Sequence, residues 1–146
     1  MSRHPGFKSI HRIIDVNINR TKEGLRVCEE ITRFILNSRA LTSGFKKIRH
    51  DIDGVVKQLP LRVCDLLRER KSLKDVGSTI IVHELRRKDV RDIFCANIQR
   101  VKESTRVLEE FSKLISKKCS LKFKKIRYDT YEIEKKATQR ISRLMS

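Results

Sequence analysis

The residues best suited to chemistry in this sequence are an asparagine, an arginine and a glutamate that follow one another at intervals of three in two separate stretches. They are Asn17, Arg20 and Glu23 in the first stretch and Asn97, Arg100 and Glu103 in the second. Arginine offers paired N–H donors that match the oxygens of a phosphate or carboxylate, and carboxylates are ligands for hard cations such as Mg²⁺. The pattern therefore predicts an anion site, with a divalent cation as its companion.

Both stretches belong to a motif that occurs twice along the chain. Asn17–Phe34 and Asn97–Leu114 are identical at 9 of 18 positions, and Phe45–Asp51 and Phe123–Asp129 are identical at 6 of 7. Two matched blocks in the same order indicate an internal duplication.

Each unit is predicted to be a pair of helices joined by a short turn, because its apolar residues recur at helical spacing. The expected stripes are Ile13, Ile14, Leu25, Cys28, Ile31 and Ile35, then Phe45, Ile48, Ile52, Val55, Val56 and Leu59; in the second unit Ile93, Phe94, Leu108, Phe111 and Ile115, then Phe123, Ile126, Ile133 and Ala137. Thr42 and Ser120 are the expected N-caps of the second helix in each unit. We predict an all-α, antiparallel helical bundle with pseudo-twofold symmetry. It would form one domain over residues 1–146, with units at about 9–59 and 89–143 linked by 60–88.

On a helical wheel Asn17 lies in the middle of the first apolar stripe, and Arg20 lies within it, about 60° away. Asn97 and Arg100 take the same places in the second unit. Unpaired polar groups inside a protein are costly, so these side chains need partners. Two interpretations stay open: a buried network in which Arg20 pairs with a carboxylate across the bundle, and an inward-facing pocket that grips phosphate.

A second group of polar residues follows in each unit. The triplet Arg49–His50–Asp51 recurs as Arg127–Tyr128–Asp129. Arg49 is expected near the edge of an apolar stripe, whereas His50 points away, so Arg49 and Arg127 are the pocket candidates. Asp51 is either a metal ligand or the partner of an arginine.

The linking segment contains a turn-like run, Asp75–Thr79. The backbone at Gly77 and the hydroxyls of Ser78 and Thr79 can donate hydrogen bonds to an anion. No P-loop motif is present, so any nucleotide must be bound in another way. Ile80–His83 is a short β-branched run, too brief to imply a sheet.

The composition favours an anionic partner and a reducing compartment. The formal net charge is +17, which attracts nucleic acid, anionic lipid or phosphorylated metabolites, although a merely solvated basic surface is equally compatible with it. The four cysteines, Cys28, Cys64, Cys95 and Cys119, show no metal-binding spacing and are expected in the core. With no long apolar run and no signal-peptide pattern, we expect a cytoplasmic protein that does not bind membranes.

The run Asp15–Phe34, the IRHD and DVGST sequences and the second N-x-x-R-x-x-E block resemble the small helical hydroxymethylpyrimidine-phosphate kinases of thiamin biosynthesis. The likeness extends from about Ile13 to Ile133, with the motifs in the family's order. That family occurs alone or fused to thiamin-phosphate synthase. The resemblance implies that ATP phosphorylates hydroxymethylpyrimidine phosphate to its diphosphate, with Mg²⁺ as cofactor. It also implies a functional link to a separate synthase.

The resemblance and the spacing together give a set of candidate site residues. The catalytic candidates are Arg20, Arg100, Glu23 and Glu103. The candidates for binding substrate or ATP are Asn17, Arg26, Arg49, Asn97, Arg106, Arg127, Gly77, Ser78 and Thr79. The candidate metal ligands are Asp75, Glu30 and Asp51. The sequence does not decide which unit carries the site or whether a homodimer completes it.

Other classes of function remain open. A basic run that includes Lys117, Lys118, Lys124 and Lys125 suits the phosphate backbone of nucleic acid, but the aromatic content of 5% offers no obvious stacking platform. The further alternatives are an enzyme that grips an anionic metabolite without metal, such as a mutase, and an interaction module without catalysis.

Overall fold

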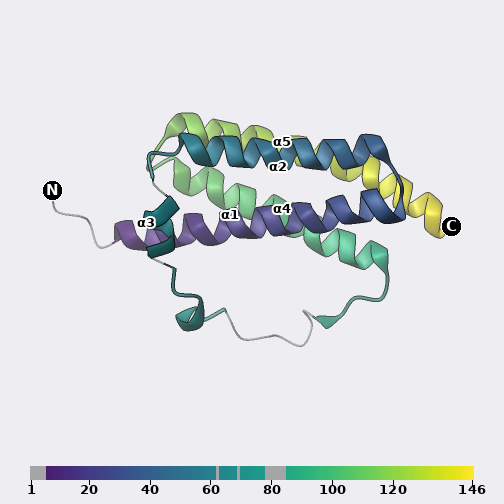
Figure 1. Ribbon diagram of the computed structural model, residues 1–146, viewed down its shortest axis with the longest axis horizontal. Helices are drawn as coiled ribbons and strands as arrows, with labels where there is room; N and C mark the ends of the chain where they lie inside the picture. Colours follow the sequence, from purple (N-terminus) through teal and green to yellow (C-terminus); the bar gives the residue numbers. More distant parts are fainter. Residues whose placement is uncertain (1–5, 62, 69, 78–84) are drawn as a thin grey trace.

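Four long helices make up most of the computed structural model, which describes residues 6–61, 63–68, 70–77 and 85–146 (Figure 1). They are α1 (Gly6–Glu30), α2 (Arg39–Gln58), α4 (Val90–Ser112) and α5 (Lys117–Met145). A π-helical turn, η1 (Ile31–Ile35), continues α1; a short helix, α3 (Val63–Arg68), and a 3-10 turn, η2 (Ser72–Lys74), lie between α2 and α4. The described residues contain no strand, so the predicted all-α class is confirmed. Ile80–His83 lies outside them.

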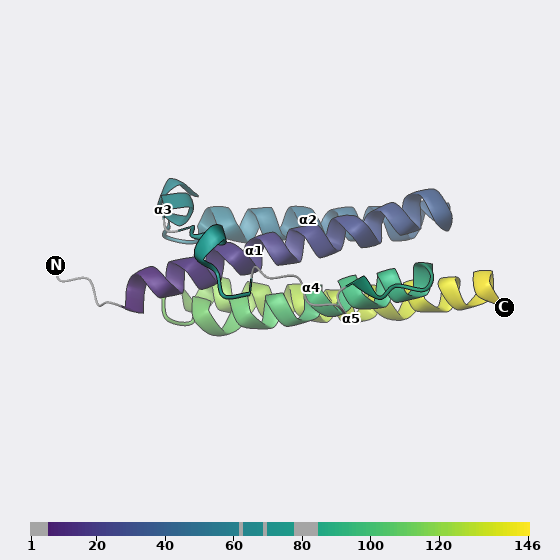
Figure 2. The ribbon, with the colours of Figure 1, turned by 90° about the horizontal axis from the view of Figure 1, so that it is seen from below.

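The long helices form two hairpins, α1–α2 and α4–α5, that pack against each other (Figure 2). Helix α1 contacts both α2 and α4, and α5 likewise contacts both α2 and α4. Neighbouring helices run in opposite directions (Figure 1). This is the antiparallel arrangement that the repeated motif predicts, whereas the duplication itself stays a prediction.

The second helix of each hairpin begins one turn earlier than predicted. The Oγ of Ser38 accepts a hydrogen bond from the backbone N–H of Leu41, and the Oγ of Ser116 accepts one from Cys119, each at 3.2 Å. Thr42 and Ser120, the predicted caps, instead lie inside the helices and donate their hydroxyls to backbone carbonyls. The error arises because serine and threonine recur at helical spacing there, so the sequence offers two caps of the same chemistry.

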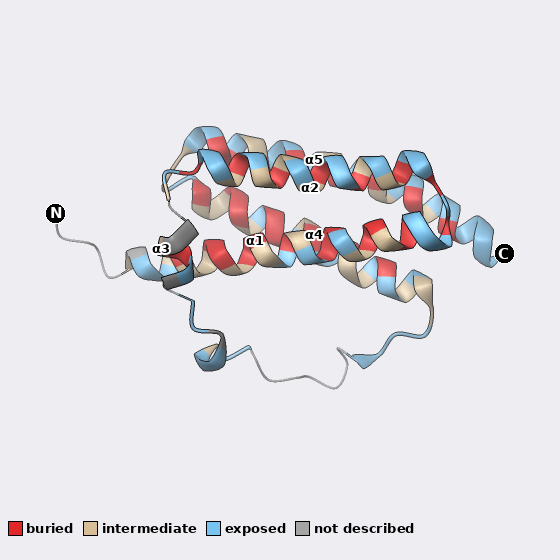
Figure 3. Cartoon of the chain, in the orientation of Figure 1, coloured by how far each residue is buried: buried red, intermediate tan, exposed pale blue. Residues whose placement is uncertain are grey.

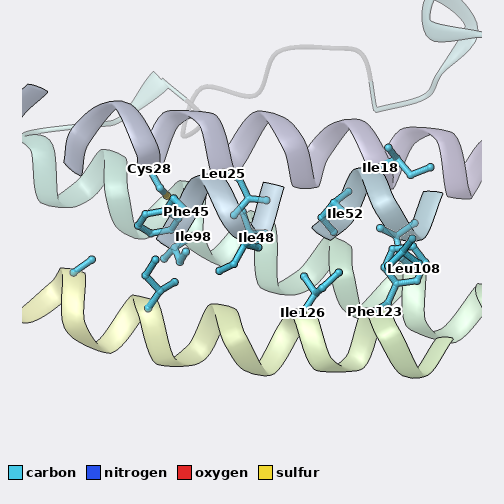
Figure 4. Packing of buried hydrophobic residues seen from close by; sticks show 14 of the residues in the cluster. Ile18, Leu25, Cys28, Phe45, Ile48, Ile52, Ile98, Leu108, Phe123 and Ile126 are labelled. Carbon is cyan, nitrogen blue, oxygen red and sulfur yellow. The ribbon is translucent and has the colours of Figure 1, made fainter. Parts of the chain in front are cut away.

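The buried residues form a stripe along the inner side of each long helix (Figure 3). Phe45, Phe94 and Phe123 come from three different helices and are fully buried; Figure 4 shows the first and the last of them. Phe45 meets Phe94 edge to face, with ring centroids 6.2 Å apart. Burying one such side chain stabilises the fold by about 1.5–3 kcal/mol. Ile35, which the apolar pattern placed in the core, is 41% exposed because it lies in the π-turn that ends the first helix.

Helices α1 and α4 approach each other closely where small residues face the partner helix. The hydroxyls of Thr21 and Ser104 are hydrogen-bonded across the interface at 2.6 Å. A Cβ added to Gly24 would lie 2.7 Å from a methyl group of Val101 and 2.9 Å from the carbonyl oxygen of Asn97. Thr21 aligns with Val101 and Gly24 with Ser104 in the repeated motif, so the two contacts are reciprocal, as a twofold relation requires.

Only some of the cysteines, which the composition places in the core, are buried as expected. Cys28 and Cys119 are buried as predicted, and burial raises the pKa of the Cys28 thiol. Cys95 is exposed, because it lies on the outer side of α4, and the side chain of Cys64 is outside the described part of the chain. Among the described residues, no helix combines the length and apolarity needed to cross a bilayer.

Replacing Gly24 by Ala tests the close approach of α1 and α4. Alanine favours a helix over glycine by about 1 kcal/mol, but the added methyl group would collide with a backbone carbonyl that cannot rotate away. We expect a net loss of about 1–2 kcal/mol in the free energy of unfolding, measured by chemical denaturation. The control is Gly54→Ala on α2, where a new Cβ meets nothing within 4 Å and stability should rise. A stabilised Gly24→Ala protein would contradict the packing.

Candidate functional site

A cleft of about 380 Å³ lies beside α1, between its N-terminal half, α4 and the segment that follows α3. The described residues that line it include five cationic side chains and three carboxylates. Its lining residues are Arg12, Asp15, Val16, Asn19, Arg20, Glu23, Arg70, Lys71, Asp75, Gly77 and Arg100. We refer to this as the first cleft. An excess of arginine and lysine in a concave site favours a multiply charged anion.

A partly buried ion pair joins the linking segment to α1 at the wall of the first cleft. Arg70 donates Nε and one Nη to the two oxygens of Asp15, at 2.9 and 2.8 Å. Asp15 is 6% exposed, and its hydrogen bond raises the pKa of the Arg70 guanidinium. The fork geometry fixes the direction of Arg70 and brings Lys71 and Asp75 over α1.

Arg20 and Arg100 are two of the cations of this cleft that remain open to a ligand, as Arg12 and Lys71 also do among the described residues. Arg20 and Arg100 are both exposed, and among the described residues neither forms an ion pair or a side-chain hydrogen bond. Their predicted position inside the bundle is therefore wrong, and so is the network in which Arg20 pairs across it. The buried face of α1 is centred near Thr21 and Leu25, roughly 100° or more from Arg20, so that the guanidinium reaches the rim instead.

The two asparagines of the motif each bond to their own helix but differ in burial. Asn17 is buried, and its Nδ2 donates to the carbonyl of Ile13 at 2.8 Å. Asn97 makes the same bond to Ile93, but it is only half-buried. Both amides thus bond to their own helix, but Asn97 also lines a further cleft.

That further cleft, which we call the second cleft, adjoins the first and has a volume of about 370 Å³. It is lined by Glu23, Val27, Arg87, Ala96, Asn97, Gln99, Arg100 and Glu103. Glu23 and Arg100 line both clefts. The structure therefore brings together all four predicted catalytic residues, two from α1 and two from α4.

Four other predicted phosphate-binding arginines hold buried carboxylates instead. Glu29, which is 5% exposed, accepts from Arg26 at 2.9 Å and from Arg49 at 3.3 Å. Glu109 repeats the arrangement, accepting from Arg127 at 2.9 Å and from Arg106 at 3.4 Å. Glu109 raises the pKa of Arg127, which also donates to the hydroxyl of Tyr131. These ion pairs neutralise the buried carboxylates. They do not close the arginines off, since the Arg26 and Arg106 side chains are more than half exposed, and Arg106 and Arg127 line a cleft of about 430 Å³.

The remaining predicted residues are dispersed. Asp75 lines the first cleft, and its Oδ1 accepts the N–H of Gly77 at 2.8 Å, so this N–H is turned to Asp75 and not to a ligand. Asp51 pairs with Lys47 at 2.9 Å and lines a groove between α2 and α5 together with His50. Glu30 lies at the end of α1. Ser78 and Thr79 lie outside the described residues. No cluster of three or more potential metal ligands occurs in the described part of the chain.

Sequence reasoning missed several residues that shape the first cleft: Arg12, Asp15, Arg70 and Lys71. Arg12 and Asp15 lie on α1 about 80° and 140° around the helical wheel from Arg20, so helical spacing alone does not group them with it. The other two belong to a segment without a repeated counterpart, and no spacing rule connects them to α1.

The comparisons with known proteins agree on one group. The model of the ThiD2 family matches residues 12–136. A thiamine-phosphate synthase of Synechocystis sp. is 39% identical to this chain over 127 residues, which are 86% of the chain and 35% of that protein. Similar proteins of the same name occur in Nostoc punctiforme, at 35% identity over 86% of the chain and 34% of the relative, and in Rhodopirellula baltica, at 34% identity over 85% and 33%. The chain thus spans about a third of these relatives. No solved structure gives a significant match.

Substituting Asp15 by Asn tests whether the Asp15–Arg70 pair holds the linking segment over α1. The neutral amide cannot accept both N–H groups of Arg70, so amide hydrogen exchange in residues 70–77 should become faster. Because 41% of the Arg70 side chain is exposed, we expect the free energy of unfolding to fall by only about 1 kcal/mol. Asp53→Asn removes the exposed pair with Lys22 and should leave exchange in this segment unchanged. Unaltered exchange in the Asp15 variant would show that other contacts hold the segment.

Proposed function

Because this chain belongs to the ThiD2 family, we propose that it acts in thiamine biosynthesis as an ATP-dependent kinase of hydroxymethylpyrimidine phosphate. The thiamine pathway is supported by the family and by relatives that are named thiamine-phosphate synthases. The kinase reaction is a finer proposal, supported by the family motif in both units and by the cationic cleft described above. We also propose a functional link to a thiamine-phosphate synthase, which the names of the relatives suggest.

The observation that carries the proposal is that two arginines, Arg20 and Arg100, line one cleft without an ion-pair partner among the described residues. Phosphoryl transfer requires reactants in line and neutralisation of the charge on the phosphate oxygens, and little covalent chemistry by the protein. Two guanidinium groups from different helices can contact one transferring phosphoryl group from two sides. The other arginines of the repeated motif that the sequence singled out face carboxylates, whereas these two do not.

The proposed reaction forms a bond between an oxygen of the acceptor phosphate and the γ-phosphorus of ATP. The bond from this phosphorus to the β–γ bridging oxygen breaks, and ADP leaves. A phosphate monoester is largely a dianion at neutral pH, since its second pKa is about 6, so the attacking oxygen carries no proton. No general base is needed. The carboxylate of Glu23 would act by orienting ligands or by binding a cation.

The first cleft offers carboxylate oxygens that could bind the Mg²⁺ that accompanies a nucleotide. Glu23 is exposed, and only one oxygen of Asp75 is engaged by Gly77. Mg²⁺ in nucleotide sites is held by one or two carboxylates together with phosphate oxygens and water, so a larger cluster is not required. When bound, the ion would neutralise charge on the ATP phosphates. Asp15 is less suited to this role because Arg70 engages both of its oxygens.

Replacing Arg20 or Arg100 by Ala tests the proposal. The assay mixes the pure protein with ATP, Mg²⁺ and hydroxymethylpyrimidine phosphate and measures the diphosphate and ADP. Loss of a group that stabilises the transferring phosphoryl should lower kcat by about 10²–10³-fold. Arg91→Ala is the control, because Arg91 is exposed on α4 and outside both clefts. A folded Arg100→Ala protein with normal turnover would remove Arg100 from the site, and an inactive wild-type protein would refute the kinase.

One observation favours a second candidate function, the binding of single-stranded nucleic acid. Tyr128 and Tyr131 are 53% and 39% exposed on α5, and Lys124 lies 5.9 Å from the Tyr128 ring. Exposed aromatic rings among cations can stack on bases. This function predicts binding that weakens steeply with salt and persists in the Arg20 and Arg100 variants.

A further inference from the structure

The two clefts are related by the same approximate symmetry as α1 and α4. The first cleft contains Val16, Asn19, Arg20 and Glu23 of α1, and the second contains Ala96, Gln99, Arg100 and Glu103 of α4. These are the same positions of the repeated motif, offset by 80 residues. Two similar cavities therefore flank the place where Thr21 meets Ser104 and share Glu23 and Arg100.

The linking segment makes the two cavities different. At the first cleft it contributes Arg70, Lys71 and Asp75, and α1 adds Arg12. At the second cleft, Arg87 is the one described residue that the linking segment contributes. Counted over the described residues, the first cleft holds five cations, whereas the second holds Arg87 and the shared Arg100 beside two carboxylates.

We propose that the two clefts bind the two reactants separately: the nucleoside triphosphate in the first and the phosphorylated acceptor in the second. This inference rests on the proposed kinase function and assigns its substrates to sites. A triphosphate carries more charge than a monophosphate, and it matches the cleft with more cations and with the carboxylates that suit its counter-ion. The second cleft adds the side-chain amides of Asn97 and Gln99. Their NH2 groups already donate to the carbonyl of Ile93 and to Glu103, but their carbonyl oxygens can accept hydrogen bonds from the donors of a heterocyclic ring.

The shared residues then lie where transfer takes place. The γ-phosphorus leaves its bridging oxygen on the nucleotide in the first cleft and bonds to the phosphate oxygen of the acceptor in the second. Arg100 lines both cavities and can contact the phosphoryl group before and after transfer. If both substrates shared one cavity, no cation would have to lie between two clefts.

Steady-state kinetics with both substrates varied separate the two sites. Lys71→Ala changes only the first cleft and should raise the KM for ATP about tenfold, with little change in the KM for the pyrimidine phosphate. Arg87→Ala changes only the second and should do the reverse. Both side chains are exposed, so folding should be preserved. The matched controls are Lys74→Ala and Arg86→Ala, two exposed neighbours outside both clefts. Equal effects on both substrates, or the opposite pattern, would overturn the assignment while leaving the kinase intact.

The assignment of substrates to clefts can also be tested by a binding measurement that does not require enzyme activity. Calorimetric titration with inorganic tripolyphosphate should show binding that Lys71→Ala weakens about tenfold and Arg87→Ala leaves unchanged. If the wild-type protein shows this pattern but no turnover, the kinase proposal fails and the first cleft still stands as a polyphosphate site. If tripolyphosphate binding depends on Arg87 and not on Lys71, the assignment is wrong whatever the activity.

Discussion

The close contact between α1 and α4 is the constraint on which the site depends. Gly24 lies against Val101 and Asn97, and the hydroxyls of Thr21 and Ser104 bond across the interface. Because neither helix carries a large side chain here, the backbones come near enough for the outer flanks of both helices to share one surface. Arg20 and Arg100 project from these flanks to the same cleft. A bulkier interface would separate the two guanidinium groups, whatever their own rotamers.

The arginines of the repeated motif divide into two groups by the direction in which their helix face points. Those around Glu29 and Glu109 neutralise buried carboxylates and stabilise each hairpin. Arg20 and Arg100 lie on the other flank and have no acidic partner among the described residues. A protein with a formal charge of +17 has fewer acids than bases, so unpaired arginines are expected somewhere. Their convergence from two helices on one concave site is what favours a ligand.

The sequence predicts the fold more completely than the site, for physical reasons. Helical periodicity and the repeated motif specify four helices and two hairpins, because both follow from local spacing. The wheel misplaced Arg20 because it counted only apolar residues as core, whereas Thr21 and Gly24 form much of the buried face through a hydrogen bond and a close approach. The contact of Arg70 with Asp15 joins residues 55 positions apart and has no periodic signature.

Binding of phosphate by Arg20 and Arg100 can be seen in a structure of the protein with a non-hydrolysable ATP analogue, Mg²⁺ and hydroxymethylpyrimidine phosphate. We expect phosphate density against both guanidinium groups, with the arginines at Glu29 and Glu109 still in their ion pairs. Phosphates bound at Arg49 or Arg127 instead, with Arg20 and Arg100 left in solvent, would contradict this binding mode.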